Sequence, residues 1–159
     1  MQILDYINHI LDGPASVLTK MIEKVPDQKI QFKPYDESMS VAELVCHILS
    51  VMQIHFHAIS EGQGNKEHAQ RIPIDPKSIN TAEVLVLHMN EVLQSIKDIL
   101  PNITPEILER VVVYKQWNDY EIQGSVALLY IIEEFLHHRG QLSIYLRLLG
   151  LEPPFLYRY

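Results

Sequence analysis

The chain has 159 residues, 47% hydrophobic and 21% charged, a balance typical of one globular domain and not of a disordered chain. Its formal net charge of -7, with no run of Lys or Arg, argues against nucleic-acid binding, because a phosphate backbone needs a basic patch. The single cysteine, Cys46, excludes an internal disulfide, and no apolar run reaches the roughly 18 residues of a membrane span. The first residues lack the basic start of a signal peptide, so we expect one cytoplasmic domain, residues 1–159, with no membrane or nucleic-acid partner.

The first half of the chain contains two segments with apolar residues at helical spacing. The first covers residues 1–25 and contains the pair Gly13–Pro14, which predicts a kink or a break at that point. The second covers about residues 40–60. Ser40 is a good N-cap, and Glu43 three residues later completes a capping-box pattern, so this helix has a well-defined start.

The second half adds two more helices. Residues 62–78 are polar and contain glycines and prolines, which predicts a loop, and a third helix follows over about residues 81–101. In residues 102–123 the β-branched run 111–114 and a turn-like segment after it favour a short hairpin. A last helix covers residues 124–150, with its final glycine as the C-cap. The pattern predicts an all-α four-helix bundle with one long connection before the last helix.

A candidate metal site begins with Glu134 and His138, which stand four residues apart and therefore share one face of the last helix. That face is otherwise apolar, and a carboxylate buried there costs several kcal/mol or more unless it is paired, neutralised or bound to a cation. The second helix offers His47 and His55, each within an apolar stripe, and periodicity does not choose between them. The simpler alternative is an ordinary ion pair of Glu134 with His138, worth about 0.3–0.5 kcal/mol, beside a core histidine.

Other candidate residues have more ordinary interpretations. Gln141 lies on the inward stripe of the last helix, where it could hydrogen-bond a ligand from a second shell or pair with another buried polar group. Gly140 is expected to let another helix approach closely, and Cys46 to be a buried, inert thiol. Four further histidines show no partner at helical spacing and are expected on the surface: His9, His57, His68 and His88.

Two segments carry a family resemblance. One runs from His137-His138-Arg139-Gly140-Gln141 through Gly150 to Pro153-Pro154, and the other runs from Phe32-Lys33-Pro34 through Ser40 to Ile48. Together they resemble the DinB/YfiT-like family of metalloenzymes, with the order kept along the whole chain. The resemblance implies a four-helix bundle, often dimeric, with a divalent metal on three histidines. One of these comes from the second helix and two come from the last helix at i, i+4.

Carried over residue by residue, the resemblance implies His47 and His138 as ligands, and it favours His47 over His55. Glu134 stands where the family usually has the third histidine, so the implied set becomes two histidines and a carboxylate. Zinc, nickel, iron and manganese are the candidate metals. The harder, anionic carboxylate moves the preference away from nickel and towards zinc, iron or manganese.

The resemblance also implies two alternative functions. Relatives act as thiol S-transferases or thiol-dependent isomerases, which implies a metal-dependent enzyme that uses a low-molecular-weight thiol against a small electrophile. The alternative is a non-catalytic, stress-related protein with a vestigial or structural metal site, and the change at Glu134 favours it. Both imply a homodimer.

Overall fold

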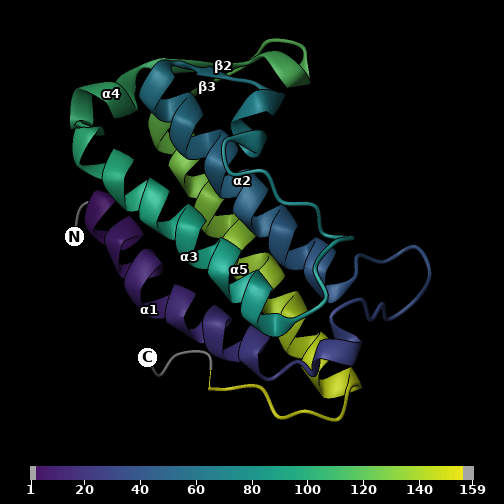
Figure 1. Cartoon of the computed structure of the whole chain (residues 1–159). Helices are drawn as coiled ribbons and strands as arrows, with labels where there is room; N and C mark the ends of the chain where they lie inside the picture. The colour runs from purple at the N-terminus through teal and green to yellow at the C-terminus, as the bar shows by residue number, and fades with distance from the viewer. Residues whose placement is uncertain (1–2, 156–159) are drawn as a thin grey trace.

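The computed structural model describes residues 3–155, and four long helices form a bundle in this range (Figure 1). They are α1 (Ile3–Glu23), α2 (Val41–Glu61), α3 (Ala82–Ile99) and α5 (Gly124–Leu148). Helix α2 packs against α3 and α5, and α1 packs against the same two helices. One continuous hydrophobic core joins all four, which confirms the predicted all-α bundle.

Helix α1 is continuous through Gly13 and Pro14, so the predicted break does not occur. Proline lacks the N–H that would bond to the carbonyl of Ile10, and this weakens one turn of the helix. Residues on both sides of Pro14 are buried in the same core, as Ile10 and Leu18 illustrate. Burial of one continuous apolar face therefore outweighs the loss of a single backbone hydrogen bond.

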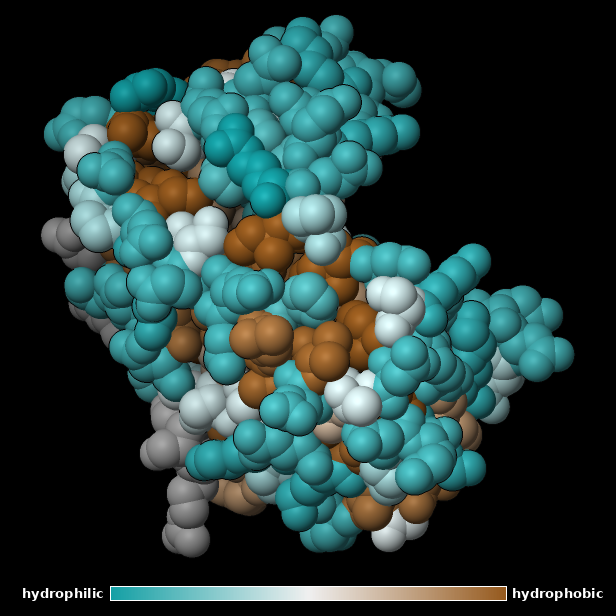
Figure 2. Space-filling view, in the orientation of Figure 1, coloured by the Kyte–Doolittle hydropathy of each residue, from teal (hydrophilic) through white to brown (hydrophobic). Residues whose placement is uncertain are grey.

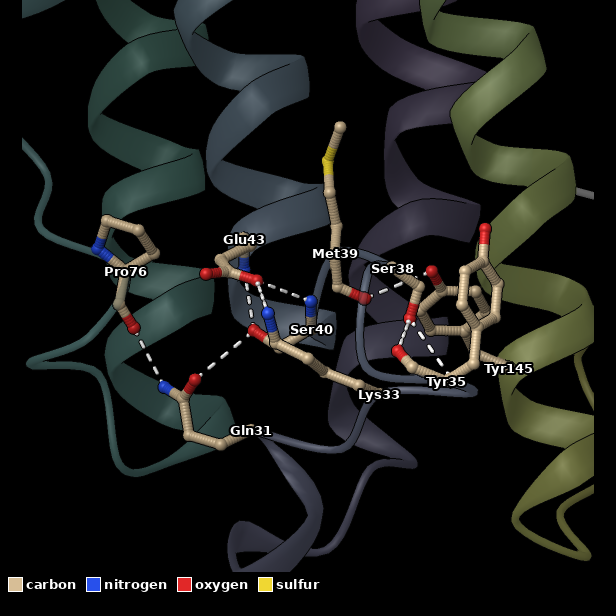
Figure 3. Close-up of polar contacts among 9 residues, drawn as sticks. All are labelled: Gln31, Lys33, Tyr35, Ser38, Met39, Ser40, Glu43, Pro76 and Tyr145. Atoms are coloured by element: carbon tan, nitrogen blue, oxygen red, sulfur yellow. Dashed lines mark hydrogen bonds and ion pairs between the residues drawn. The ribbon is translucent and has the colours of Figure 1, made fainter.

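The start of α2 is fixed by the predicted capping box, which Figure 3 shows. The Ser40 hydroxyl accepts a hydrogen bond from the Glu43 backbone N–H at 3.1 Å, and the Glu43 carboxylate accepts one from the Ser40 N–H at 2.7 Å. The Lys33 ammonium lies 2.9 Å from the same carboxylate. Nearby, the Tyr145 hydroxyl of α5 donates to the Met39 carbonyl at 3.1 Å, so α5 is tied to the entry of α2 (Figure 3).

A small three-stranded sheet lies across one end of the bundle (Figure 1). The predicted hairpin is present in the connection before α5, as β2 (Val111–Tyr114) paired antiparallel with β3 (Tyr120–Gln123). Strand β1 (Gln63–Gly64), directly after α2, pairs parallel with β2 and was not predicted. The remaining short elements are 3-10 helices η1 (Asp27–Lys29), η2 (Lys66–Gln70), η3 (Leu100–Asn102) and η4 (Lys115–Trp117), and α4 (Pro105–Glu109).

Gly64 lets the hairpin approach α2 closely. A Cβ atom on Gly64 would lie 2.5 Å from the ring of Tyr114, a distance that no side chain tolerates. The Tyr114 ring therefore packs against bare backbone and is fully buried. This contact anchors the hairpin beside the C-terminal half of α2.

Helix α2 is long and apolar enough to cross a membrane by length and composition, but 72% of its most apolar 18-residue window is buried inside the bundle. A core helix of a bundle has the same composition, so this is weak support for a span.

Cys46 on α2 is buried, as predicted, and desolvation raises the pKa of its thiol to about 12. On the face seen in Figure 2, hydrophobic side chains reach the surface over the middle of the molecule. Val84 and Leu87 of α3 are among the exposed apolar residues.

Candidate metal centre

Helices α2 and α5 bring His47, Glu134 and His138 together. One ligand atom from each side chain lies within 4.8 Å of the other two. A Glu134 carboxylate oxygen lies 3.0 Å from His138 Nε2 and 3.5 Å from His47 Nε2. The two imidazole rings stand edge to face with their centroids 4.7 Å apart. This cluster could hold a metal ion.

The spacing of these atoms fits a small divalent cation. Ligands about 2.0–2.1 Å from a tetrahedral zinc ion lie about 3.3 Å from one another. The two distances to Glu134, 3.0 and 3.5 Å, bracket that value. Two of the three ligand–ligand distances therefore suit a metal, and the third, between the two histidines, lies within 4.8 Å.

Gln141 holds the His138 ring through the nitrogen that faces away from the cluster. Its amide oxygen lies 2.6 Å from His138 Nδ1, and its amide nitrogen lies 3.1 Å from His137 Nε2. An amide oxygen only accepts hydrogen bonds, so Nδ1 carries a proton and donates it. Such a bond to the distal nitrogen fixes the tautomer and the orientation of a metal-binding histidine.

With that proton on Nδ1, the cluster contains an unfavourable contact that a positive charge would relieve. With the proton on Nδ1, a neutral His138 directs the lone pair of Nε2 at the Glu134 carboxylate, 3.0 Å away. Two electron-rich atoms at that distance repel unless a proton or a metal cation lies between them. His47 does not supply the charge readily, because burial first, and repulsion from His138 second, lower its pKa.

Glu134 is more exposed than its place on an apolar stripe predicts. Its side chain is 43% exposed and that of His47 is 38% exposed, whereas that of His138 is 8% exposed. The desolvation cost expected for a buried carboxylate is therefore largely avoided. The cluster has one buried ligand and two that face an open side, an arrangement that leaves room for a further ligand or a substrate.

His55 does not belong to the cluster. Its Nδ1 lies 2.5 Å from the Tyr114 hydroxyl, and burial lowers the pKa of His55 to about 4. His47 and His55 are both on α2, but only His47 faces Glu134 within ion-pair distance. The rotation of α2 against α5 therefore places His47, and not His55, next to Glu134.

The structure corrects two of the histidines expected on the surface. His57 and His68 are buried, and the Glu61 carboxylate lies 3.9 Å from His57 Nδ1 and 3.1 Å from His68 Nε2. Arg71 also contacts Glu61, so a cation already neutralises this carboxylate. Burial, and then the positive charge of Arg71, lower the pKa of His57 to about 4. The overlooked signal was the four-residue spacing of His57 and Glu61.

Comparisons with known proteins agree with this architecture. The DinB family model matches residues 4–159. The uncharacterized protein YjoA of Bacillus subtilis strain 168 is 28% identical over 144 residues, which cover 91% of this chain and 88% of YjoA. The crystal structure of this DinB-like YjoA superposes with a TM-score of 0.76 over 99% of both chains. A DinB-like protein from Bacillus cereus ATCC 10987, 16% identical, shares the fold with a TM-score of 0.70 over 91% of both chains.

Proposed function

This chain belongs to the DinB family, and from that premise we propose that it is a cytoplasmic, divalent-metal-dependent enzyme that joins a low-molecular-weight thiol to a small electrophile. The observation that carries the proposal is the cluster of His47, Glu134 and His138, whose ligand atoms have the spacing of a metal site and face an open side. Three protein ligands with an open position are typical of catalytic metal sites, whereas structural sites are closed.

The metal would act as a Lewis acid that lowers the pKa of a thiol or water at its open position. The chain's residues have separate roles around it. His47 and His138 present Nε2 lone pairs, and Gln141 keeps the His138 proton on Nδ1. In the reaction the thiol sulfur forms a bond to an electrophilic carbon. The displaced electron pair leaves with a leaving group or moves into an adjacent π system, and the thiol proton goes to solvent.

Zinc, iron and manganese are the metals that this ligand set favours. Two imidazoles and one carboxylate suit zinc and non-haem iron, and the carboxylate is harder than the histidine usual in the family. Nickel remains a candidate because imidazole binds it well. We propose zinc for the first test, because it needs no redox control.

Elemental analysis of protein purified without an affinity tag tests the proposal. We expect close to one equivalent of divalent metal per chain, and a melting temperature that falls when a chelator is added. The metal-loaded protein is then assayed with low-molecular-weight thiols against a panel of electrophiles. A protein that is metal-free as purified, and whose melting temperature does not change with zinc, nickel, manganese or iron, would contradict the proposal.

The alternative function is a non-catalytic, stress-related dimer with a structural or vestigial site. The half-exposed Glu134, at the position where the family usually has histidine, is the observation that favours it. Glu134→His distinguishes a working metal site from a vestigial one, and the thiol assay distinguishes a catalytic site from a structural one. If Glu134 is a working ligand, the substitution changes which metal is preferred but leaves measurable uptake in both proteins. If the site is vestigial, only Glu134→His takes up metal.

A further inference from the structure

A cavity of about 550 Å³ opens beside the candidate metal centre. Its walls come from three parts of the chain: α2, α5, and the η4–β3 segment of the hairpin. The lining residues are His47, Val51, His55, Trp117, Tyr120, Tyr130 and Glu134. His47 and Glu134 form the polar end next to the cluster, and the remaining wall is mostly aromatic. The volume lies within the range of small-molecule sites.

The aromatic wall is held in place by contacts outside the cavity. The Trp117 indole stacks on the buried Tyr114 ring, with centroids 4.7 Å apart and planes at 24°. The hydroxyls of Tyr120 and Tyr130 lie 3.2 Å apart, so the hairpin is joined to α5 across the cavity. Fixed aromatic faces favour planar, apolar ligands, because stacking then needs little ordering of side chains.

His55 gives this wall one directed polar group. The buried Tyr114 hydroxyl lies 2.5 Å from His55 Nδ1, and no second hydrogen-bond partner of that hydroxyl is found among the described residues. The O–H therefore donates to Nδ1, since a buried hydroxyl proton rarely stays unbonded. Burial keeps the pKa of His55 near 4, so at neutral pH its single proton sits on Nε2. His55 lines the cavity although only 3% of it is exposed, so we infer that this N–H, on the side of the ring away from Tyr114, is the group that would meet a ligand there.

The charge of the lining excludes one class of ligand. Among the described residues that line the cavity, Glu134 is the one acidic side chain and none is Lys or Arg. An anionic group placed among the aromatic rings would be desolvated without a counter-charge. An anionic ligand body is therefore disfavoured, and an oxygen acceptor would complement His55.

We propose that this cavity binds the electrophile itself, as a neutral, planar aryl carbonyl compound whose carbonyl oxygen accepts a hydrogen bond from His55 Nε2. The assignment rests on the proposed function, which it narrows to a substrate class. An α,β-unsaturated ketone with an aryl group on its β carbon meets the requirement. The thiol sulfur bonds to its β carbon, the π pair moves towards the carbonyl, and the α carbon takes up the proton that the thiol releases.

Binding can be observed without any metal, because Trp117 is the single tryptophan of the chain and its indole N–H gives one cross-peak in a proton–nitrogen correlation spectrum. The probes are benzylideneacetone, a neutral aryl enone, and cinnamate, an anion with the same styryl skeleton. In chelator-treated protein we expect benzylideneacetone to shift the Trp117 cross-peak and to bind at least tenfold more tightly than cinnamate. Equal binding of both probes, or no shift with either, would overturn the assignment.

Two variants test how the cavity recognises the enone. Asn at position 55 keeps an acceptor for the Tyr114 hydroxyl and removes the Nε2–H, so His55→Asn should weaken enone binding about tenfold. Val51→Lys places a cation in the cavity and should turn the preference towards cinnamate. Val84→Lys, at an exposed position on α3 outside the cavity, is the matched control and should leave the preference unchanged. A preference that Val51→Lys does not alter would contradict the assignment even if His55→Asn fails to fold.

The result of the enone-binding experiment can be distinguished from that of the metal tests. Enone binding by a protein that takes up no metal would contradict the proposed function and leave the cavity assignment standing. Metal uptake without enone binding would contradict the cavity assignment and leave the proposed function standing. A Trp117 cross-peak that moves with protein concentration, in the absence of any probe, would show that a second copy of the chain covers the cavity and would also overturn the assignment.

Discussion

Substitutions of Gln141 test whether the cluster is arranged to bind a metal. It accepts a hydrogen bond from His138 Nδ1 at 2.6 Å, and loss of such a partner typically lowers metal affinity about 10- to 100-fold. We therefore expect Gln141→Leu to weaken zinc binding by that factor, measured by competition with a chromophoric chelator. Gln141→Glu keeps an acceptor and should retain most of the affinity. Unchanged affinity in Gln141→Leu would show that His138 is not a ligand held in this way.

His55 makes the folding stability depend on pH. Its pKa is about 4 in the folded protein, because burial outweighs the favourable field of Glu134, and it returns to about 6.5 on unfolding. The unfolded chain thus binds the proton first, so stability is complete above pH 6.5 and falls as the pH drops towards 4. Each pKa unit is worth about 1.4 kcal/mol, so the loss is roughly 3 kcal/mol.

Urea unfolding of the wild type and His55→Asn, at several values between pH 7 and pH 4, measures this contribution. The free energy of unfolding should fall less steeply in the variant, because Asn does not titrate. His57, also with a pKa of about 4, contributes to the slope in both proteins, as do the carboxylates. Parallel slopes in the two proteins would contradict the shift assigned to His55.

At this scale the sequence predicted the three residues that the structure brings together, but helical spacing supplied only two of them and the family resemblance supplied His47. Glu134 and His138 were paired correctly in space because residues four apart on a helix are neighbours whatever the helix packs against. The partner on α2 could not be chosen from periodicity, because α2 is buried around most of its circumference and any rotation satisfies the pattern. Tyr114 and Trp117, which hold His55, come from a hairpin more than 50 residues away and leave no local signal near it.

At the scale of elements, a substitution in the capping box of α2 should lower the folding stability without changing the metal affinity. Ser40→Ala removes the acceptor for the Glu43 N–H, and the loss of such a cap costs about 1 kcal/mol. Chemical denaturation should therefore show a less stable protein. Zinc affinity should stay close to that of the wild type, because His47 lies beyond the first turn of α2. Ser40→Thr keeps the hydroxyl and serves as the control; a large loss of zinc affinity in Ser40→Ala would contradict this separation.

The elements that the sequence predicted are those with local signals. The capping box marked the start of α2, and the glycine after α5 accounts for its end, where Gly150 has a φ of 75° and its N–H bonds to the Arg147 carbonyl. Strand β1 has only two residues and pairs with β2 almost 50 positions later, so no alternation could reveal it. Of the kink or break expected at Pro14, the break does not occur, because core packing on both sides outweighs one missing bond.

At the scale of the whole molecule, the outer face of α5 is the surface that we propose for contact with a second copy of the chain. Gly140, Ile144 and Leu148 follow one another at four-residue spacing. Nothing lies within 4 Å of the place where a Cβ of Gly140 would be, so the close helix approach expected there does not occur within the described chain. Ile144 and Leu148 are 58% and 59% exposed. Paired across a two-fold axis, such a face would bury both apolar side chains and let two helices meet at the glycine.

We therefore expect a homodimer, measured by sedimentation equilibrium at about 0.15 M salt, where the Debye length of about 8 Å screens the repulsion between two chains of charge -7. The double variant Ile144→Lys with Leu148→Lys should be monomeric, with helical circular dichroism unchanged, because both side chains are already exposed. Val84→Lys with Leu87→Lys, which alters exposed apolar residues of α3, should remain dimeric. A monomeric wild type would contradict the expected homodimer. A dimer that survives the α5 substitutions and dissociates with those on α3 would place the interface elsewhere.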